Sequence, residues 1–191
     1  MSHNFAENLS VFFQQHANPE RAEQMQAYMR GQFAFYGLSS ATVKSLLAEY
    51  VQQEGFPAPE NLPMVLRDLW DYDEREMQYV GTKLVRRLIE KQLASFIEIL
   101  EDLITRKSWW DTVDALSLDA GTLFKTHPSL QPSTTNRWID SKNIWLQRAA
   151  IIHQLMYKKD TDWEMLQTYI LSTCHNSEFF IRKAAGWALR Q

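Results

Sequence analysis

The order of apolar and polar residues along this chain predicts one helix after another. No segment shows the period-two alternation, bounded by turn residues, that indicates a β-strand, so we expect no sheet. The predicted helices span residues 3–16, 19–30, 40–54, 60–71, 74–91, 92–105, 109–124, 133–140, 143–158, 162–173 and 177–190. The break GFPAPENLP at residues 55–63 is a connection between helices rather than a domain linker. The pattern therefore predicts an all-α fold.

Polar residues at the starts of several segments support these boundaries. Asn18 and Pro19 form an N-cap and a first-turn proline, and residues 161–164 (TDWE) form a capping box. Residues 73–76 (DERE) open the next segment in the same way, and residues 108–111 (SWWD) fit the capping pattern too. Asp111 then complements the positive end of its helix. Asp114 has no such local role, so its charge needs another explanation.

A repeat of 34 to 35 residues runs through the later part of the chain. WLQRAAIIHQL (145–155) and FIRKAAGWALR (180–190) superimpose at an offset of 35, and the same step back from Trp145 reaches Trp110 and then Arg75. Recurrent helices with a partner helix between them indicate stacked helical pairs. We therefore expect an α-α superhelix, or solenoid, of HEAT-like helical repeats that forms a single domain over residues 1–191.

The repeat brings several polar and aromatic side chains to one predicted face. Asp114 and Trp110 lie four residues apart on one helix face, and equivalent positions on the next two recurrent helices hold Arg148 and Lys183. Trp187 lies four residues after Lys183. The predicted face therefore carries two indoles, one carboxylate and two cations.

Each member of this face also has an ordinary structural reading. A tryptophan in a helical repeat is commonly packed in the core, and Asp114 could form a structural ion pair with Arg148. The shared position in the repeat favours a site, because core tryptophans should not share a face with a charged row. Trp109 points about 100° away from Trp110 on the helix, so we expect Trp109 to pack in the core.

The chemistry of this face suits a cationic, sugar-like substrate with phosphates. Indoles attract cations, a carboxylate can stabilise an oxocarbenium-like transition state, and arginine binds phosphate bidentately. An alkylated purine nucleotide in DNA has all three features. The net charge of −3 is distributed unevenly, with 4 Lys/Arg against 10 Asp/Glu in residues 1–74 and 16 against 13 in residues 75–191. We expect Arg86, Arg87 and Lys91 to extend a basic track along a DNA backbone.

The motifs SWWDTVD, NIWLQRAA and FFIRKAAGWALR resemble the bacterial AlkD family of DNA alkylation repair glycosylases, as do QAYMRGQFAFYGL (26–38) and EREMQY (74–79). The resemblance covers nearly the whole chain. It implies hydrolytic removal of N3- and N7-alkylated purines from double-stranded DNA without a metal or organic cofactor. It also implies that Asp114 is catalytic, that Trp110, Trp187 and Arg148 belong to the site, and that Tyr28 contacts DNA.

The same resemblance raises a question about the C-terminus, since members of the family continue past the GWxLR motif with further helices. We expect the C-terminal cap to be missing or short in this chain. Because the resemblance also implies reading of the exposed lesion backbone and sugar, we expect no deep purine pocket.

Other features set further expectations. The five histidines show no metal-ligand spacing with Cys174 or one another, so we expect no metal site, and His153 should be a structural residue. The single cysteine, the lack of a secretory signal and the lack of a membrane span predict a cytoplasmic protein. We also expect a monomer. The alternative function is a non-catalytic HEAT-like module that binds DNA or other proteins. Duplex binding that falls with salt would separate a DNA-binding protein from a protein scaffold.

Overall fold

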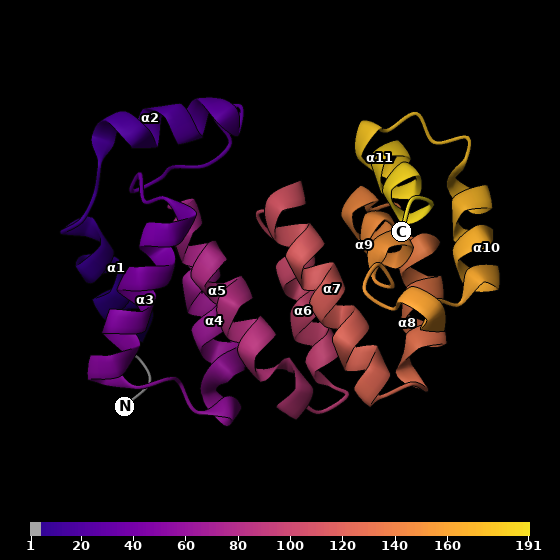
Figure 1. The fold of residues 1–191 in the computed structure, drawn as a ribbon, viewed down its shortest axis with the longest axis horizontal. Helices are drawn as coiled ribbons and strands as arrows, with labels where there is room; N and C mark the ends of the chain where they lie inside the picture. The colour runs from indigo at the N-terminus through magenta and orange to yellow at the C-terminus, as the bar shows by residue number, and fades with distance from the viewer. Residues whose placement is uncertain (1–4) are drawn as a thin grey trace. The chain divides into compact units, whose positions relative to one another are not determined.

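The computed structural model describes residues 5–191, and all of the regular elements in this range are helical (Figure 1). The α-helices are α1 (Phe5–Gln14), α2 (Pro19–Tyr28), α3 (Ser40–Glu54), α4 (Leu62–Asp71), α5 (Arg75–Leu88), α6 (Phe96–Thr105), α7 (Trp110–Thr126), α8 (Leu130–Ile139), α9 (Ile144–Ile152), α10 (Trp163–Thr173) and α11 (Phe179–Ala188). Three short 3-10 helices are η1 (Pro59–Asn61), η2 (Ile89–Lys91) and η3 (Lys158–Asp160). The prediction of an all-helical repeat fold is confirmed.

Most predicted boundaries lie within a few residues of the observed ones, with one larger difference. The start of predicted helix 3–16 lies partly outside the described residues, and predicted helix 143–158 ends early, at Ile152. After Ile152 the chain turns, because the Gln154 side chain accepts from the Asp162 backbone N–H at 2.7 Å and fixes the return toward α10. Lys158 adopts a positive φ of 55° in this turn. This side-chain contact stabilises the turn that follows α9.

The recurrent helices of the repeat have the predicted spacing. Helices α5, α7, α9 and α11 begin at Arg75, Trp110, Ile144 and Phe179, in steps of 34 or 35 residues. Helix α9 packs against α7, α8, α10 and α11. Ala149 and Ala150 on α9 are fully buried, and their small side chains allow this close packing.

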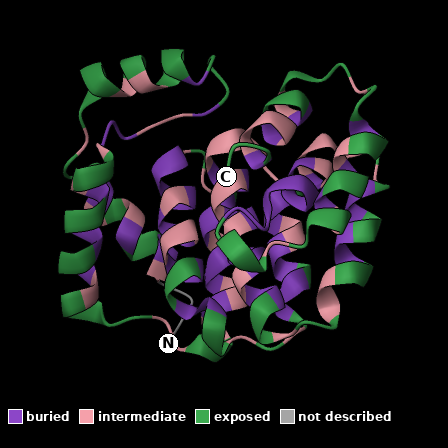
Figure 2. Cartoon of the chain, turned by 45° about the vertical axis from the view of Figure 1, so that its right-hand side comes forward, coloured by how far each residue is buried: buried purple, intermediate pink, exposed green. Residues whose placement is uncertain are grey.

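Contacts divide the chain into two compact units, residues 1–84 and 85–191, with the boundary inside α5. In the first unit, α1 packs against α3 and α4. Helix α2 differs from these helices because it has no buried residue, and it is the largely exposed helix at the top of Figure 2. Asn18 caps α2 by accepting from the Arg21 backbone N–H at 3.0 Å, as predicted.

The segment that follows α2 is held by one buried carboxylate. Glu76 accepts backbone N–H groups from Tyr36, Gly37 and Leu38 at 3.1, 2.9 and 3.0 Å. We call this contact the Glu76 clasp. Residues 73–76 were predicted to open a helix, and α5 begins at Arg75; the sequence did not predict that the Glu76 carboxylate would hold a distant segment. Gly37 lies so close to Asn18 that an added Cβ would come within 2.0 Å of the Asn18 carbonyl oxygen.

In the second unit, α7 and α9 approach closely at Gly121. An added Cβ there would lie 2.1 Å from the carbonyl oxygen of His153. Tyr157 donates its hydroxyl to the Gly121 carbonyl at 2.7 Å. These contacts join α7 to the segment that follows α9.

Candidate active site around Asp114

Helix α7 presents two different faces. The buried stripe contains Thr112, Leu116, Asp119 and Leu123, at helical spacing. Trp110 and Asp114, one turn apart on another face, are only half-buried. The predicted site residues of α7 are therefore placed where solvent or a ligand can reach them.

Asp114 forms a bidentate ion pair with Arg148 of α9. Arg148 donates from Nε to Oδ1 at 2.6 Å and from Nη2 to Oδ2 at 2.8 Å. The third donor of this guanidinium, Nη1, donates to the Phe180 carbonyl of α11 at 2.7 Å. Three successive recurrent helices thus meet at a single arginine.

Burial and the ion pair act on Asp114 in opposite directions. Desolvation raises the pKa of Asp114, Arg148 lowers it, and the net direction is upward. Asp111, three residues earlier, adds to the upward shift of this pKa through like-charge repulsion. Arg148 is thus the group that favours the charged form of Asp114 in this partly desolvated position.

Arg148 has a different environment from the one that the sequence predicted. A phosphate ligand was expected, but the side chain is 6% exposed and its three donor groups are already bound within the protein. This arrangement suits an arginine that positions a carboxylate. It also corresponds to the ion pair that the sequence left open as an alternative.

An aromatic cluster borders the ion pair. Trp109 packs on Phe180 and Trp145, with ring centroids 5.1 and 5.8 Å apart, and Trp145 lies 4.8 Å from Phe180. Trp109 thus has the packing role that was expected of it, although it remains half-buried. Phe180, whose backbone carbonyl accepts from Arg148, had not been singled out from the sequence.

The start of α7 differs from the predicted capping box at residues 108–111. The N-cap position is Trp109, which provides no side-chain hydrogen bond. Ser108 instead donates its hydroxyl back to the Ile104 carbonyl at 2.6 Å. Asp111 accepts from the adjacent Thr112 N–H at 2.9 Å. Similarly, α10 is capped by Asp162 rather than by Thr161, because Asp162 accepts from the Met165 N–H at 3.0 Å.

The remaining predicted site residues lie on several elements. On α11, Trp187 is half-buried and Lys183 is exposed, with the Lys183 ammonium 5.4 Å from the centre of the Phe179 ring. Arg87 on α5 and Lys91 on η2 are exposed. Tyr28, at the end of α2 in the first unit, is 72% exposed.

Arg86 pairs with a buried carboxylate that the sequence reading had not identified. Its Nε donates to Oδ1 of Asp119 on α7, and the Asp119 side chain is fully buried. Burial raises the pKa of Asp119 to about 7 even though Arg86 lowers it. A charged residue seven positions after Thr112 on an apolar stripe is the sequence signal that could have found Asp119.

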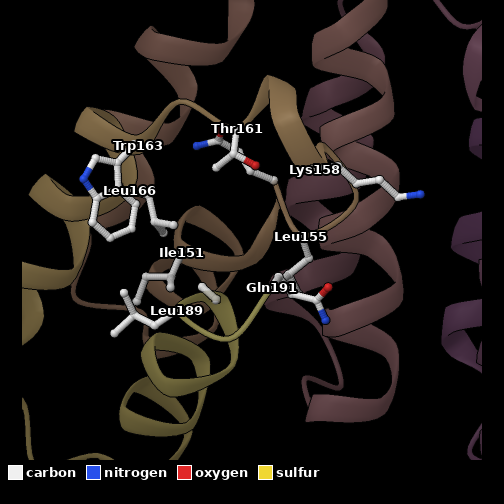
Figure 3. A pocket seen from close by; sticks show the side chains of 10 residues that line it. Ile151, Leu155, Lys158, Thr161, Trp163, Leu166, Leu189 and Gln191 are labelled. Carbon is white, nitrogen blue, oxygen red and sulfur yellow. The ribbon is translucent and has the colours of Figure 1, made fainter.

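The pocket in Figure 3 is a separate feature of the second unit. It has a volume of about 250 Å³ and is lined by α9, α10 and the end of α11, with Ile151, Trp163 and Leu189 on its wall. None of the predicted site residues lines it. In residues 5–191, no cluster of His, Cys, Asp or Glu side chains is arranged to hold a metal ion. Across the same range, none of the helices combines the length and apolarity that crossing a bilayer requires.

His153 is fully enclosed between helices. Its Nδ1–H donates to the Ala150 carbonyl at 2.8 Å, and Nε2 accepts from the Gln131 side-chain amide at 3.2 Å. Burial lowers the pKa of His153 to about 4, so the ring is neutral at physiological pH. Its contacts are those of a structural histidine, as predicted.

Comparisons with known proteins agree on one family. The family model described as "DNA alkylation repair enzyme" matches residues 11–191. Among solved structures, a predicted DNA alkylation repair enzyme from Enterococcus faecalis is similar, with 31% sequence identity and a TM-score of 0.83. That match covers 91% of this chain and 82% of the other. No curated protein matches the chain.

Proposed function

Because the chain belongs to the DNA alkylation repair enzyme family, we propose that it is a DNA glycosylase that removes cationic N3- and N7-alkylated purines from double-stranded DNA. The observation that carries the proposal is the bidentate contact of Arg148 with Asp114. It holds the Asp114 carboxylate, 17% exposed, on the half-buried face of α7. A fixed negative charge in a partly desolvated place is suited to stabilising positive charge that develops during a reaction.

The carboxylate of Asp114 supports the proposed substrate class, because a cationic alkylpurine requires only one carboxylate in the chemistry. Glycoside hydrolases normally use two, one to protonate the leaving group and one to stabilise the sugar cation or activate water. An alkylated purine already carries a positive charge, so it leaves as a neutral base without protonation. One carboxylate is then sufficient for the remaining task.

In the proposed reaction the C1′–N bond breaks and its electron pair neutralises the purine ring. Positive charge develops on the deoxyribose, where Asp114 stabilises it. Water then forms the new bond to C1′ and loses a proton to Asp114 or to solvent, which leaves an abasic site and a free base. No step requires an oxidant or a metal ion.

The other side chains have supporting roles in this proposal. Trp110 and Trp187 pack against the sugar and backbone of the lesion, since indoles bind both C–H surfaces and cations. Arg148 orients Asp114. Lys183, Arg86, Arg87, Lys91 and Tyr28 contact the DNA backbone.

The test is excision of 7-methylguanine from a duplex, followed as strand cleavage at the resulting abasic sites. Wild-type protein should excise the base with chelator present, and Asp114→Asn should be slower by about 100-fold or more because the amide carries no negative charge. Circular dichroism would establish that the variant is folded. Excision by Asp114→Asn at the wild-type rate would contradict the assignment. Duplex binding without excision by the wild type would instead favour the non-catalytic DNA-binding module.

A further inference from the structure

Two carboxylates of helix α7, Asp114 and Asp119, each pair with an arginine, and the two pairs differ in a way that indicates different roles. Asp114 pairs with Arg148 of α9, and Asp119 pairs with Arg86 of α5. Five residues on a helix correspond to a rotation of about 140°, so the two carboxylates lie on different flanks of α7. The recurrent helix on each side of α7 therefore supplies one arginine to it.

The two guanidinium groups differ in exposure and in the use of their donors. The Arg148 side chain is 6% exposed and uses Nε, Nη1 and Nη2 within the protein. The Arg86 side chain is 54% exposed, and its contact with Asp119 uses Nε alone. Within residues 5–191 the two terminal amino groups of Arg86 make no hydrogen bond, and more than half of the side chain is exposed. That fork of donors matches the oxygen spacing of a phosphate.

Packing alone does not account for Asp119, because burying a carboxylate costs desolvation free energy. It is fully buried, and its Oδ2 has no hydrogen-bond partner among the described residues. Replacing a whole buried ion pair by well-packed apolar side chains is often neutral or stabilising, so packing alone does not require a carboxylate here. In the structure, Asp119 accepts a hydrogen bond from Arg86 Nε and so holds that edge of the guanidinium.

The charges around Arg86 indicate an anionic ligand. Arg87 and Lys91 follow on α5 and η2, and both are exposed. Glu90 is the single acidic residue among residues 86–91, so this stretch carries a net positive charge. An anion that touched the Arg86 fork would be attracted by the neighbouring cations as well.

We propose that Asp119 is a positioning residue that holds Arg86 edge-on, so that the two terminal amino groups of Arg86 bind a backbone phosphate of duplex DNA. The inference rests on the proposed function in that the partner is DNA. It adds a residue, Asp119, that does not touch the DNA and acts through Arg86. It also explains why a carboxylate would aid the binding of a polyanion.

The direction in which Asp119→Leu changes DNA affinity distinguishes a positioning role from a general charge effect. Asp119→Leu removes a negative charge, so a general charge effect should strengthen DNA binding. Positioning predicts the opposite, because Arg86 loses its fixed orientation. Asp140→Asn is the matched control, since it removes one negative charge from an exposed site at the end of α8.

The measurement is the Kd for an undamaged duplex at about 50 and 200 mM salt, together with the melting temperature of each variant. Asp119→Leu and Arg86→Met should each weaken binding about three- to tenfold and reduce the salt slope by about 0.9. The double variant should be no weaker than either single variant. Asp140→Asn should bind as tightly as the wild type or more tightly.

Two conservative variants keep the inference testable if Asp119→Leu fails to fold. Asp119→Asn retains an oxygen that can accept from Arg86 Nε, so its Kd should stay within about twofold of the wild type. Arg86→Lys keeps the charge but lacks the fork, so it should bind about as weakly as Arg86→Met. Wild-type affinity in Arg86→Lys or Arg86→Met would overturn the inference. Tighter binding by Asp119→Leu, or additive losses in the double variant, would do so too.

Binding and excision are read separately, so the two proposals can fail independently. If the wild type excises 7-methylguanine but the Arg86 variants bind normally, the positioning role is wrong and the glycosylase assignment stands. If the binding pattern holds without excision, the positioning role stands and the glycosylase assignment is wrong. A tenfold excess of inorganic phosphate over duplex phosphate should leave the wild-type Kd unchanged at constant ionic strength. Displacement of the duplex under these conditions would show that the fork selects free phosphate, and would overturn the DNA assignment.

Discussion

Arg148 donates to both carboxylate oxygens of Asp114, at 2.6 and 2.8 Å, and this contact joins α9 to α7. Its third contact, with the Phe180 carbonyl at 2.7 Å, adds α11. The arginine therefore orients the carboxylate and favours its charged form, while burial favours the neutral acid. The pKa of Asp114 is raised on balance, so in the proposed enzyme excision depends on Arg148 limiting that rise.

Arg148→Ala should impair excision at acidic pH more than at alkaline pH. Burial still raises the pKa of Asp114 in this variant, while the lowering effect of Arg148 is gone. The acidic limb of the rate profile should therefore move to higher pH. The folded state should also lose about 3–5 kcal/mol, since removing one partner leaves a buried charge without its counter-ion.

Rates measured at saturating DNA across the pH range, and urea denaturation, would check these expectations. Arg148→Lys is the matched control, because it keeps the charge but loses the bidentate geometry. An acidic limb that does not move in Arg148→Ala would contradict the role given to Arg148.

Substituting Trp109 should mainly lower stability, whereas substituting Trp110 should mainly slow excision. Trp109→Ala removes ring contacts with Phe180 and Trp145, so it should lower the free energy of unfolding by about 2–4 kcal/mol. Trp110→Ala should lower it less, yet slow excision more strongly. Denaturation and single-turnover excision, measured on both variants, would test the division. Equal effects of the two substitutions on both measurements would show that the division is mistaken.

Helical periodicity was sufficient to predict the repeat and the meeting of Asp114 with Arg148. The offset of 34 residues places equivalent positions on neighbouring helices, and these helices pack directly. It could not predict the donor set of Arg148, because the third acceptor is a backbone carbonyl that no residue type reveals. Nor could it predict the early end of α9, where Gln154 contacts Asp162 across the following turn. Spacing predicts which helices meet, whereas the tertiary structure determines which atoms bind.

Asp119→Asn should stabilise the protein at neutral and alkaline pH. Burial raises the pKa of Asp119 from 3.8 to about 7, with Arg86 opposing the shift. The folded state therefore binds a proton more tightly than the unfolded chain. This contribution to stability is fully present below pH 3.8 and is lost as pH rises to about 7.

The asparagine cannot ionise, so the stability of Asp119→Asn relative to the wild type should increase between about pH 4 and 7 and then level off. The increase should be on the order of 2–4 kcal/mol. His153 has a lowered pKa and titrates in the same range, but it is common to both proteins and cancels in the difference. Urea denaturation at several pH values would measure the difference in unfolding free energy between Asp119→Asn and the wild type. A difference independent of pH would mean that Asp119 does not titrate in this window.

Gly37→Ala and Gly31→Ala should differ although both glycines have positive φ angles, 84° and 70°. A Cβ at Gly31 meets nothing within 4 Å, so the alanine there should cost only about 1–2 kcal/mol of backbone strain. A Cβ at Gly37 would lie 2.0 Å from the Asn18 carbonyl oxygen, and this overlap should add about 1–3 kcal/mol. Denaturation of the two variants under one condition isolates the overlap, and equal losses would refute it.

The Glu76 clasp has a consequence for how this protein can change over time. A helix usually has to satisfy the core and the surface together, so a substitution that alters one disturbs the other. Helix α2 has no buried residue, and the chain that follows it is held by a carboxylate on another helix. Substitutions on the surface of α2 can therefore change which ligands it binds with little effect on the stability of the fold. We expect the sequence of α2 to tolerate many substitutions, and we expect Glu76 and Gly37 to tolerate few.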